Sequence, residues 1–195
     1  MCNVASAWDE LPTDSAQLLL CDLQTQIVAR SKTIEPDALR RSAGVLMDIA
    51  RLFSLPTTLS VVPEGDKAPE LIFELRGSAF AQEKLRASAS PLFDEATKDL
   101  LAQSRRKVLI VGGIATEAVV LHAAIDARAQ GYEVLVPVDV CGGMSERTEQ
   151  AALRQITAAG AITTSVVSIA TKLAPDFTTD RGKELFKIVQ RLRLA

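Results

Sequence analysis

The chain has 195 residues, of which 48% are apolar and 24% are charged, and these proportions exclude disordered and fibrous classes of protein. Its 22 basic and 24 acidic side chains leave a formal net charge of −2, so a broad basic face for nucleic acid is not expected. One histidine, His122, and three cysteines are too few for a zinc site built from several such ligands or for a disulfide framework.

The chain begins with a segment, residues 1–16, that we expect to be an N-terminal extension. It carries Asp9 and Glu10 where a secretory signal would have positive charge and an unbroken apolar stretch. The longest apolar run near the middle, residues 108–115, is far shorter than the roughly 20 residues of a membrane helix. The odd number of cysteines favours a reducing compartment. We therefore expect a cytoplasmic protein that has no membrane segment.

Short apolar runs then alternate with helical patterns along the chain. The runs typical of buried strands are residues 17–21, 57–62, 107–112, 133–138 and 162–167, with a weaker candidate at 82–86. Helical patterns cover residues 37–54, 90–103, 116–130, 145–159 and 180–193. Residues 63–69 are predicted to be a surface loop. This alternation predicts a three-layer α/β fold of Rossmann type with a six-stranded parallel sheet, in one domain over residues 1–195 that closes with a C-terminal helix at 178–195.

The exits of the predicted strands carry the candidate functional residues, because ligands of parallel sheets bind beyond the carboxyl ends of the strands. Asp22 directly follows the first run, where a partly buried carboxylate suits proton transfer, although a turn or cap role fits its position equally well. Arg86 and Asp139 follow two other runs, and the glycines after Asp139 favour a turn role for it. Residues 112–119 lead from a strand into a helix through two glycines, which suits an oxyanion site.

The segment GGIATEAVVLHAAIDARAQGYEVLVPVDVCGG, residues 112–143, resembles the signature of the isochorismatase-like hydrolases, also called the cysteine hydrolase family. That signature has a Gly-x-x-Thr-x-x-Cys core, an alanine-rich helix, a Gly-Tyr/Phe turn and a strand that ends in Asp-Ala. The N-terminal LLLCDLQ, residues 18–24, is similar to the family's apolar run closing in Asp-x-Gln. The resemblance covers residues 17–180 and is to the YcaC-like branch in particular.

The resemblance implies roles for three residues of this chain. Asp22 corresponds to the family's catalytic aspartate and Arg86 to its basic residue, which is usually lysine. The family's nucleophilic cysteine corresponds to Val119, whose side chain can perform no nucleophilic chemistry. Neither Cys21 nor Cys141 offers a ready replacement, because strand alternation directs Cys21 to the opposite face from Asp22 and Cys141 lacks a helix N-terminus, which favours a packing role.

The resemblance also implies the residues that would bind a substrate. Gln24 and the turn of Ile114, Ala115 and Thr116 would line the crevice. Backbone N–H groups of Ala115 and Val119 would hold an oxyanion, often helped by a cis peptide bond, here between Ile114 and Ala115. The family further implies assembly into a homo-oligomer.

Three functions remain open. The first is an isochorismatase-family hydrolase-like protein that has lost covalent amide or imide hydrolysis, and thus a pseudoenzyme for that reaction. The second is a cysteine-independent hydrolase of isochorismatase type, in which Asp22 is the general acid that cleaves a vinyl ether. The third is a non-catalytic protein that binds a small ligand or serves as an oligomeric scaffold, and that keeps Asp22 and Arg86 as a structural ion pair. Metal-dependent amidases of the superfamily use an aspartate and two histidines, so with His122 alone we expect no metal and no cofactor.

Overall fold

A parallel β-sheet forms the centre of the computed structural model, which describes residues 11–66 and 68–193. Its strands are β1 (Ala16–Cys21), β2 (Thr57–Val61), β3 (Ala81–Leu85), β4 (Val108–Ile114), β5 (Glu133–Pro137) and β7 (Ile162–Thr164). They pair in the order β3-β2-β1-β4-β5-β7, and the short β6 (Cys141–Gly142) pairs with the end of β4. Every pairing is parallel, so the predicted sheet is confirmed.

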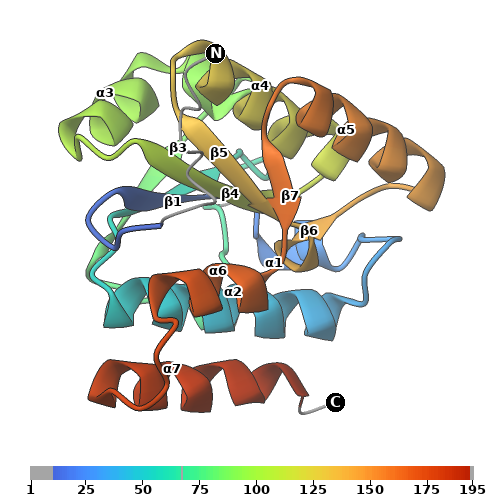
Figure 1. The fold of residues 1–195 in the computed structure, drawn as a ribbon. Coiled ribbons are helices and arrows are strands. Elements are labelled where there is room, and N and C mark those ends of the chain that lie inside the picture. The colour runs from blue at the N-terminus through green and yellow to red at the C-terminus, as the bar shows by residue number, and fades with distance from the viewer. Residues whose placement is uncertain (1–10, 67, 194–195) are drawn as a thin grey trace.

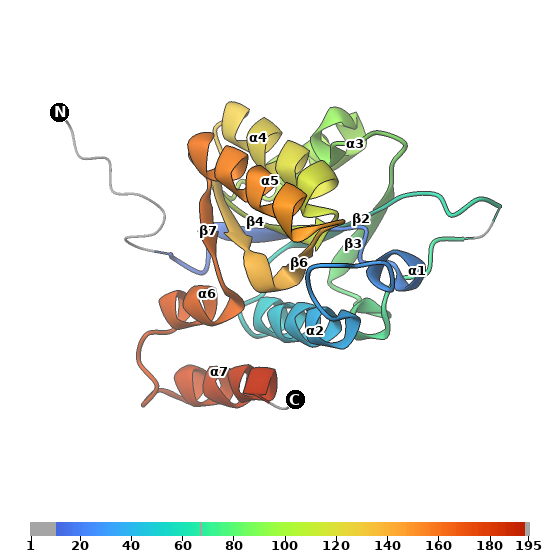
Figure 2. The ribbon, with the colours of Figure 1, turned by 90° about the vertical axis from the view of Figure 1, so that its right-hand side faces the viewer.

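Helices cover both faces of this sheet, which makes the three layers that the sequence predicts (Figure 1). On one face lie α3 (Glu95–Gln103), α4 (Leu121–Ala129) and α5 (Glu146–Ala158), and on the other lie α2 (Pro36–Leu52) and α6 (Val166–Leu173). The short α1 (Thr25–Val28) lies beside α2, and α7 (Asp180–Gln190) packs outside α2 and α6 (Figure 2). None of the helices in the described part of the chain is long and apolar enough to cross a membrane.

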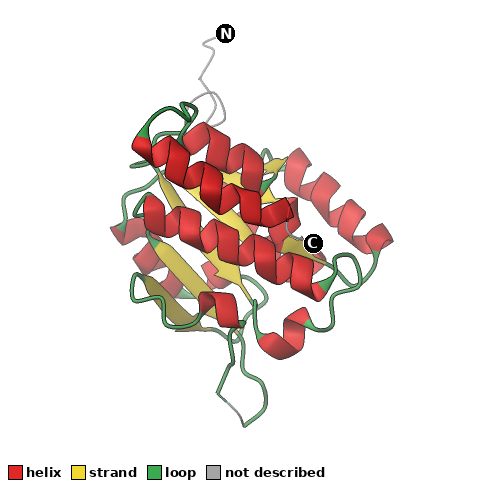
Figure 3. Ribbon diagram, turned by 90° about the horizontal axis from the view of Figure 1, so that it is seen from below, coloured by secondary structure: helices red, strands yellow, loops and turns green. Residues whose placement is uncertain are grey.

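The two central strands are buried along their whole length, β1 and β4 alike. Alternate side chains of β1 enter different layers: Leu18 and Leu20 pack with the α2 and α6 side, whereas Leu19 and Cys21 pack with the α3 to α5 side. This two-sided burial explains why the strands have continuous apolar sequences rather than alternating ones. The loop on either side of position 67 extends away from the body of the molecule, as predicted (Figure 3).

Two predicted boundaries are wrong, and in both a capping side chain is the reason. The strand predicted over residues 162–167 ends at Thr164, because Ser165 accepts a hydrogen bond from Ser168 N at 3.2 Å and starts α6. The helix predicted from residue 90 is divided in two: Ser90 caps a 3-10 turn, Pro91–Phe93, and α3 begins at Glu95, where Asp94 Oδ2 accepts from the backbone N–H of the third helical residue. The elements α1 and β6 were not predicted, since segments so short show no periodicity.

Candidate active site

The carboxyl ends of β3, β2, β1 and β4 lie side by side, because these strands are consecutive in the sheet. Asp22 follows β1 and its N–H donates to Ser60 O at 2.8 Å, while Arg86 follows β3 and its N–H donates to Val61 O at 2.9 Å. The sheet therefore brings together two residues that are 64 positions apart in the sequence.

Arg86 and Asp22 form a two-point ion pair at this edge. Arg86 Nη1 donates to Asp22 Oδ1 at 2.6 Å and Nη2 donates to Oδ2 at 2.7 Å. The guanidinium also donates from Nη1 to Ser60 Oγ at 3.1 Å and from Nε to Ser88 O at 2.9 Å. The two side chains are only 2% and 9% exposed. Both carboxylate oxygens are thus engaged by one cation, in the geometry that gives the strongest protein ion pairs.

The ion pair keeps the Arg86 guanidinium charged. Burial lowers the pKa of the Arg86 guanidinium, but the hydrogen bonds and the charge of Asp22 outweigh this effect, and the pKa is raised above its ordinary value. Arg86 therefore stays protonated and supplies a fixed positive charge, not a mobile proton. Asp22 itself has a φ of 55°, a left-handed conformation that aspartate adopts more readily than most residues.

The end of β4 lies so close to the backbone of β1 that there is no room for a side chain at Gly113. Gly113 has a φ of 146°, and a Cβ atom there would lie 2.1 Å from Cys21 O, so glycine is required. The next peptide bond, between Ile114 and Ala115, is cis, as the resemblance implies. Residues Thr116–Val120 then form a π-helical turn that leads into α4. Thr116 is buried, and its hydroxyl donates to Glu149 Oε1 at 2.7 Å.

Val119 lies in the apolar layer between the sheet and α3 to α5, and only 2% of it is exposed. Cys21 and Cys141 belong to the same layer, and both are paired in register with Gly113 on neighbouring strands. Cys21 therefore lies in the same layer as Val119, the position that corresponds to the family's nucleophile.

The two described thiols are poor nucleophiles. Burial raises the pKa of the Cys141 thiol to about 12, and burial together with the charge of Asp22 raises the pKa of the Cys21 thiol further still. Because the thiolate is the reactive form, almost none of either side chain is reactive near neutral pH. The third cysteine, Cys2, lies outside the described residues.

Gln24 is fully buried, and its amide groups are directed to the loop after β2. Gln24 Nε2 donates to Val62 O at 3.1 Å and also to Glu64, and Oε1 accepts from Val62 N at 2.8 Å. These bonds fasten the loop to the exit of β1. The hydrogen bonds of Gln24 are thus to the loop and not to the Asp22–Arg86 pair.

Asp139 has a structural contact, in agreement with the turn role that its glycine neighbours favour. Its carboxylate accepts from Val166 N at 3.0 and 3.2 Å, which caps the start of α6. Burial raises the pKa of this carboxyl, although the bonds to backbone N–H groups partly offset the rise. His122 is exposed on α4. Among residues 11–66 and 68–193, no three His, Cys, Asp or Glu side chains gather closely enough to hold a metal ion.

The sequence did not single out three residues that hold predicted site residues in place. Ser60, Ser88 and Glu149 each contact a predicted site residue. Only Ser60 had a signal in the sequence, since it lies at the end of a predicted strand whose exit adjoins that of Asp22. The other two come from a loop and from a helix that the pattern could not position.

Comparison with known proteins gives one consistent result. The model of the isochorismatase domain matches residues 16–168. A curated relative, the probable hydrolase YcaC of Escherichia coli, is 29% identical over 176 residues, which cover 87% of this chain and 83% of the relative.

Two solved structures resemble the whole described fold. YcaC from Pseudomonas aeruginosa, solved with hexane-2,5-diol and covalent acrylamide, has a TM-score of 0.86 and 25% identity, with 96% of this chain and 93% of that chain covered. YcaC from Escherichia coli, described as an octameric hydrolase of unknown specificity, has a TM-score of 0.85 and 28% identity, with 95% and 93% covered.

Proposed function

This chain belongs to the isochorismatase family, and we propose that it lacks the covalent cysteine chemistry by which related hydrolases cleave amides and imides. The observation that carries the proposal is Val119, a buried hydrocarbon side chain in the turn between β4 and α4. By resemblance this is the position of the family's nucleophile. Valine has no atom that can attack a carbonyl carbon.

Among the described residues, no side chain near Val119 makes up for the missing thiol. The raised pKa values of Cys21 and Cys141 keep both protonated, and a thiol attacks far more slowly than a thiolate. Thr116 carries a hydroxyl in the same turn, but that hydroxyl is buried and is engaged as a donor to Glu149. These contacts support the proposal that the protein does not hydrolyse amides or imides through a covalent intermediate.

The contacts of Asp22 also argue against acid catalysis by this residue. A general acid must carry a proton and present it to the substrate. Both oxygens of Asp22 accept hydrogen bonds from Arg86, which stays positively charged, so both are engaged within the protein. We therefore propose that the pair has a structural role, in which it joins the exits of β1 and β3 and keeps the crevice in shape.

The remaining role is binding of a small ligand or service as a scaffold in a homo-oligomer. Escherichia coli YcaC, which is similar over nearly the whole chain, is described as octameric, and this supports self-association here. Two buried free thiols in the described part of the chain suit a reducing compartment, which supports a cytoplasmic location.

A panel of variants tests the proposal. The native protein, Val119→Cys and Val119→Ala are assayed on small amides, imides and isochorismate, which is a vinyl ether. We expect no turnover by the native protein and amide or imide hydrolysis only by Val119→Cys. Val119→Ala is the control for space, because it opens the turn without adding a nucleophile. Native turnover would contradict the proposal, and its loss in an Asp22→Asn variant that remains folded, as checked by urea unfolding, would assign catalysis to Asp22.

A further inference from the structure

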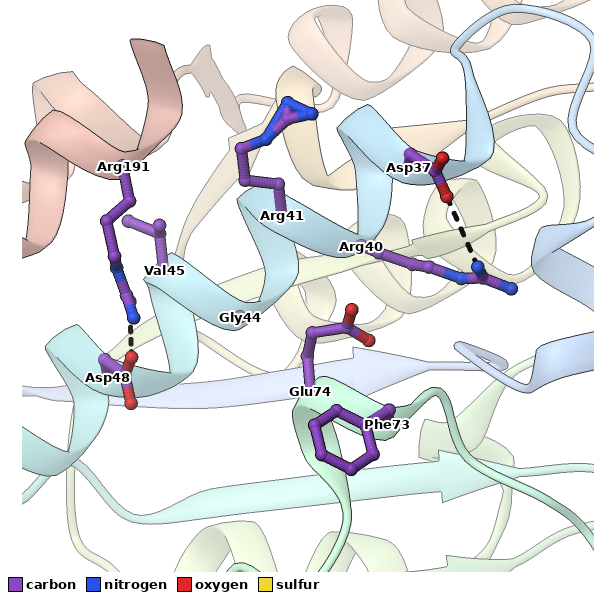
Figure 4. Close-up of a pocket in the computed structure, with 9 residues that line it drawn as sticks. All are labelled: Asp37, Arg40, Arg41, Gly44, Val45, Asp48, Phe73, Glu74 and Arg191. Atoms are coloured by element: carbon purple, nitrogen blue, oxygen red, sulfur yellow. Dashed lines mark hydrogen bonds and ion pairs between the residues drawn. The ribbon is translucent and has the colours of Figure 1, made fainter. Parts of the chain in front are cut away.

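A charged groove lies on the outer side of α2, between this helix, the turn Phe73–Leu75 and the residues that follow α7 (Figure 4). Its volume is about 460 Å³. Three basic and three acidic side chains line it: Asp37, Arg40, Arg41, Asp48, Glu74 and Arg191. Because the charges balance, the groove is not suited to a simple anion or cation. It is suited to a surface that has the same mixture of charges.

The charges on α2 have a symmetric order about Gly44. Asp37, Arg40, Asp48 and Arg51 all lie within about 40° of Gly44 around the helix, at 3.6 residues per turn. Arg40 and Asp37 precede Gly44 by four and seven positions, and Asp48 and Arg51 follow it by four and seven positions. Positions at equal distance from Gly44 therefore carry opposite charges. Asp37 and Arg51 have side chains that are 85% and 59% exposed. This face of α2 is therefore open to a partner.

An antiparallel second copy of α2, centred on Gly44, would meet opposite charges along this face. Position n of one helix then lies opposite position 88 − n of the other. Arg40 lies opposite Asp48 of the second copy, and Asp37 lies opposite Arg51. A two-fold contact uses the same patch on both copies, so each of these complementary pairs occurs twice.

Two further features of the groove lack a partner within one copy. Glu74 lies against α2, with its Cβ 3.1 Å from where a Cβ on Gly44 would be, and in the described part of the chain its Oε2 is buried without a hydrogen bond. Such an oxygen is costly unless a donor reaches it. Phe73, the neighbouring residue, is 81% exposed. A second copy would cover the Phe73 ring, whereas Glu74 Oε2 is already enclosed within one copy.

We propose that this groove is a contact between two copies of the chain, with their α2 helices antiparallel about Gly44. The inference rests on the proposed self-association and names the surface that carries it. The side chain of Glu74 fills the space above Gly44, so the two helices meet through their charged side chains and not by direct backbone approach.

Charge reversal tests the contact, with the molar mass in solution measured by sedimentation equilibrium. Arg40→Asp and Asp48→Arg each place like charges opposite one another twice, and we expect each to weaken association by more than about tenfold. The double variant Arg40→Asp/Asp48→Arg restores complementary charges between copies, so we expect association to recover. Within one copy the double variant places a like charge beside Asp37, the present partner of Arg40, and beside Arg51 and Arg191, the present partners of Asp48. If these residues act only through contacts inside one copy, the double variant should therefore associate more weakly than either single variant.

Lys98→Asp is the matched control. Lys98 pairs with Glu95 three positions earlier on α3 and is 30% exposed, much as Arg40 pairs with Asp37 and is 32% exposed. We expect no change in mass for this control. Two results would contradict a contact through this groove in a native protein that is oligomeric: single variants that associate as the native protein does, or a double variant that is more dissociated than either single variant. Both results would leave self-association through another surface intact. A native protein that is monomeric at every concentration contradicts self-association itself.

Discussion

Replacing Arg86 by methionine removes the cation of the buried pair but keeps much of the length of the side chain. The native guanidinium donates four hydrogen bonds, two of them to Asp22, and the two side chains are 2% and 9% exposed. Removal of one partner of a buried ion pair costs about 3–5 kcal/mol, because the other charge is left uncompensated. For a chain of this size, about 2–4 °C is lost per kcal/mol, so the melting temperature falls by roughly 6–20 °C.

Urea unfolding of four proteins measures this effect: native, Arg86→Met, Asp22→Asn and the double variant. We expect the double variant to lose less stability than the sum of the single losses. In Arg86→Met the buried Asp22 carboxylate is left without a cation, and Asp22→Asn removes that carboxylate. Glu70→Gln is the control, since it breaks the exposed pair between Glu70 and Arg76, which is worth under about 1 kcal/mol. A loss of less than about 1 kcal/mol in Arg86→Met would refute the reasoning, because the pair would then be solvated and not structural.

Two other substitutions test the backbone and the caps around the site. Gly113→Ala places a Cβ 2.1 Å from Cys21 O and should cost more than about 3 kcal/mol or prevent soluble expression, whereas Gly65→Ala, with nothing within 4 Å, should cost only about 1–2 kcal/mol in urea unfolding. Burial raises the pKa of Asp139, so the folded chain binds that proton more tightly than the unfolded chain and loses stability as the pH rises through this pKa. Asp139→Asn does not titrate and still accepts from Val166, so we expect its free energy of unfolding, relative to native, to rise between about pH 4 and pH 7; a constant difference would contradict the account.

The sequence predicted which apolar runs form the sheet and the edge at which functional residues gather, for a physical reason. Continuous apolar runs have one stable location, between two layers of helices, and the exits of parallel strands share one edge. Asp22 and Arg86 were therefore found at that edge. Their two-point pairing could not be predicted, because it depends on the direction of two side chains and on Ser60 and Ser88, which hold the guanidinium.

Other features depend on contacts that no local pattern reports. Val166 and Val167 are β-branched and were predicted to extend a strand, but hydrogen bonds to Ser165 and Asp139 make them the first turn of a helix. Gln24 is assigned to the crevice by resemblance, and its hydrogen bonds with the loop after β2 are a contact that no local pattern reports. For Val166 and Val167, hydrogen bonds to side chains outweigh the strand preference of the residue type.

The most direct test of the central claim is a search for a covalent intermediate. The native protein and Val119→Cys are mixed with a reactive imide, quenched in acid and digested, and the peptides are mapped by mass spectrometry. We predict no substrate-derived adduct on Cys21 or Cys141 of the native protein, and an adduct at position 119 of the variant. An adduct on a native cysteine that forms and decays at the rate of turnover would contradict the claim that covalent chemistry is absent.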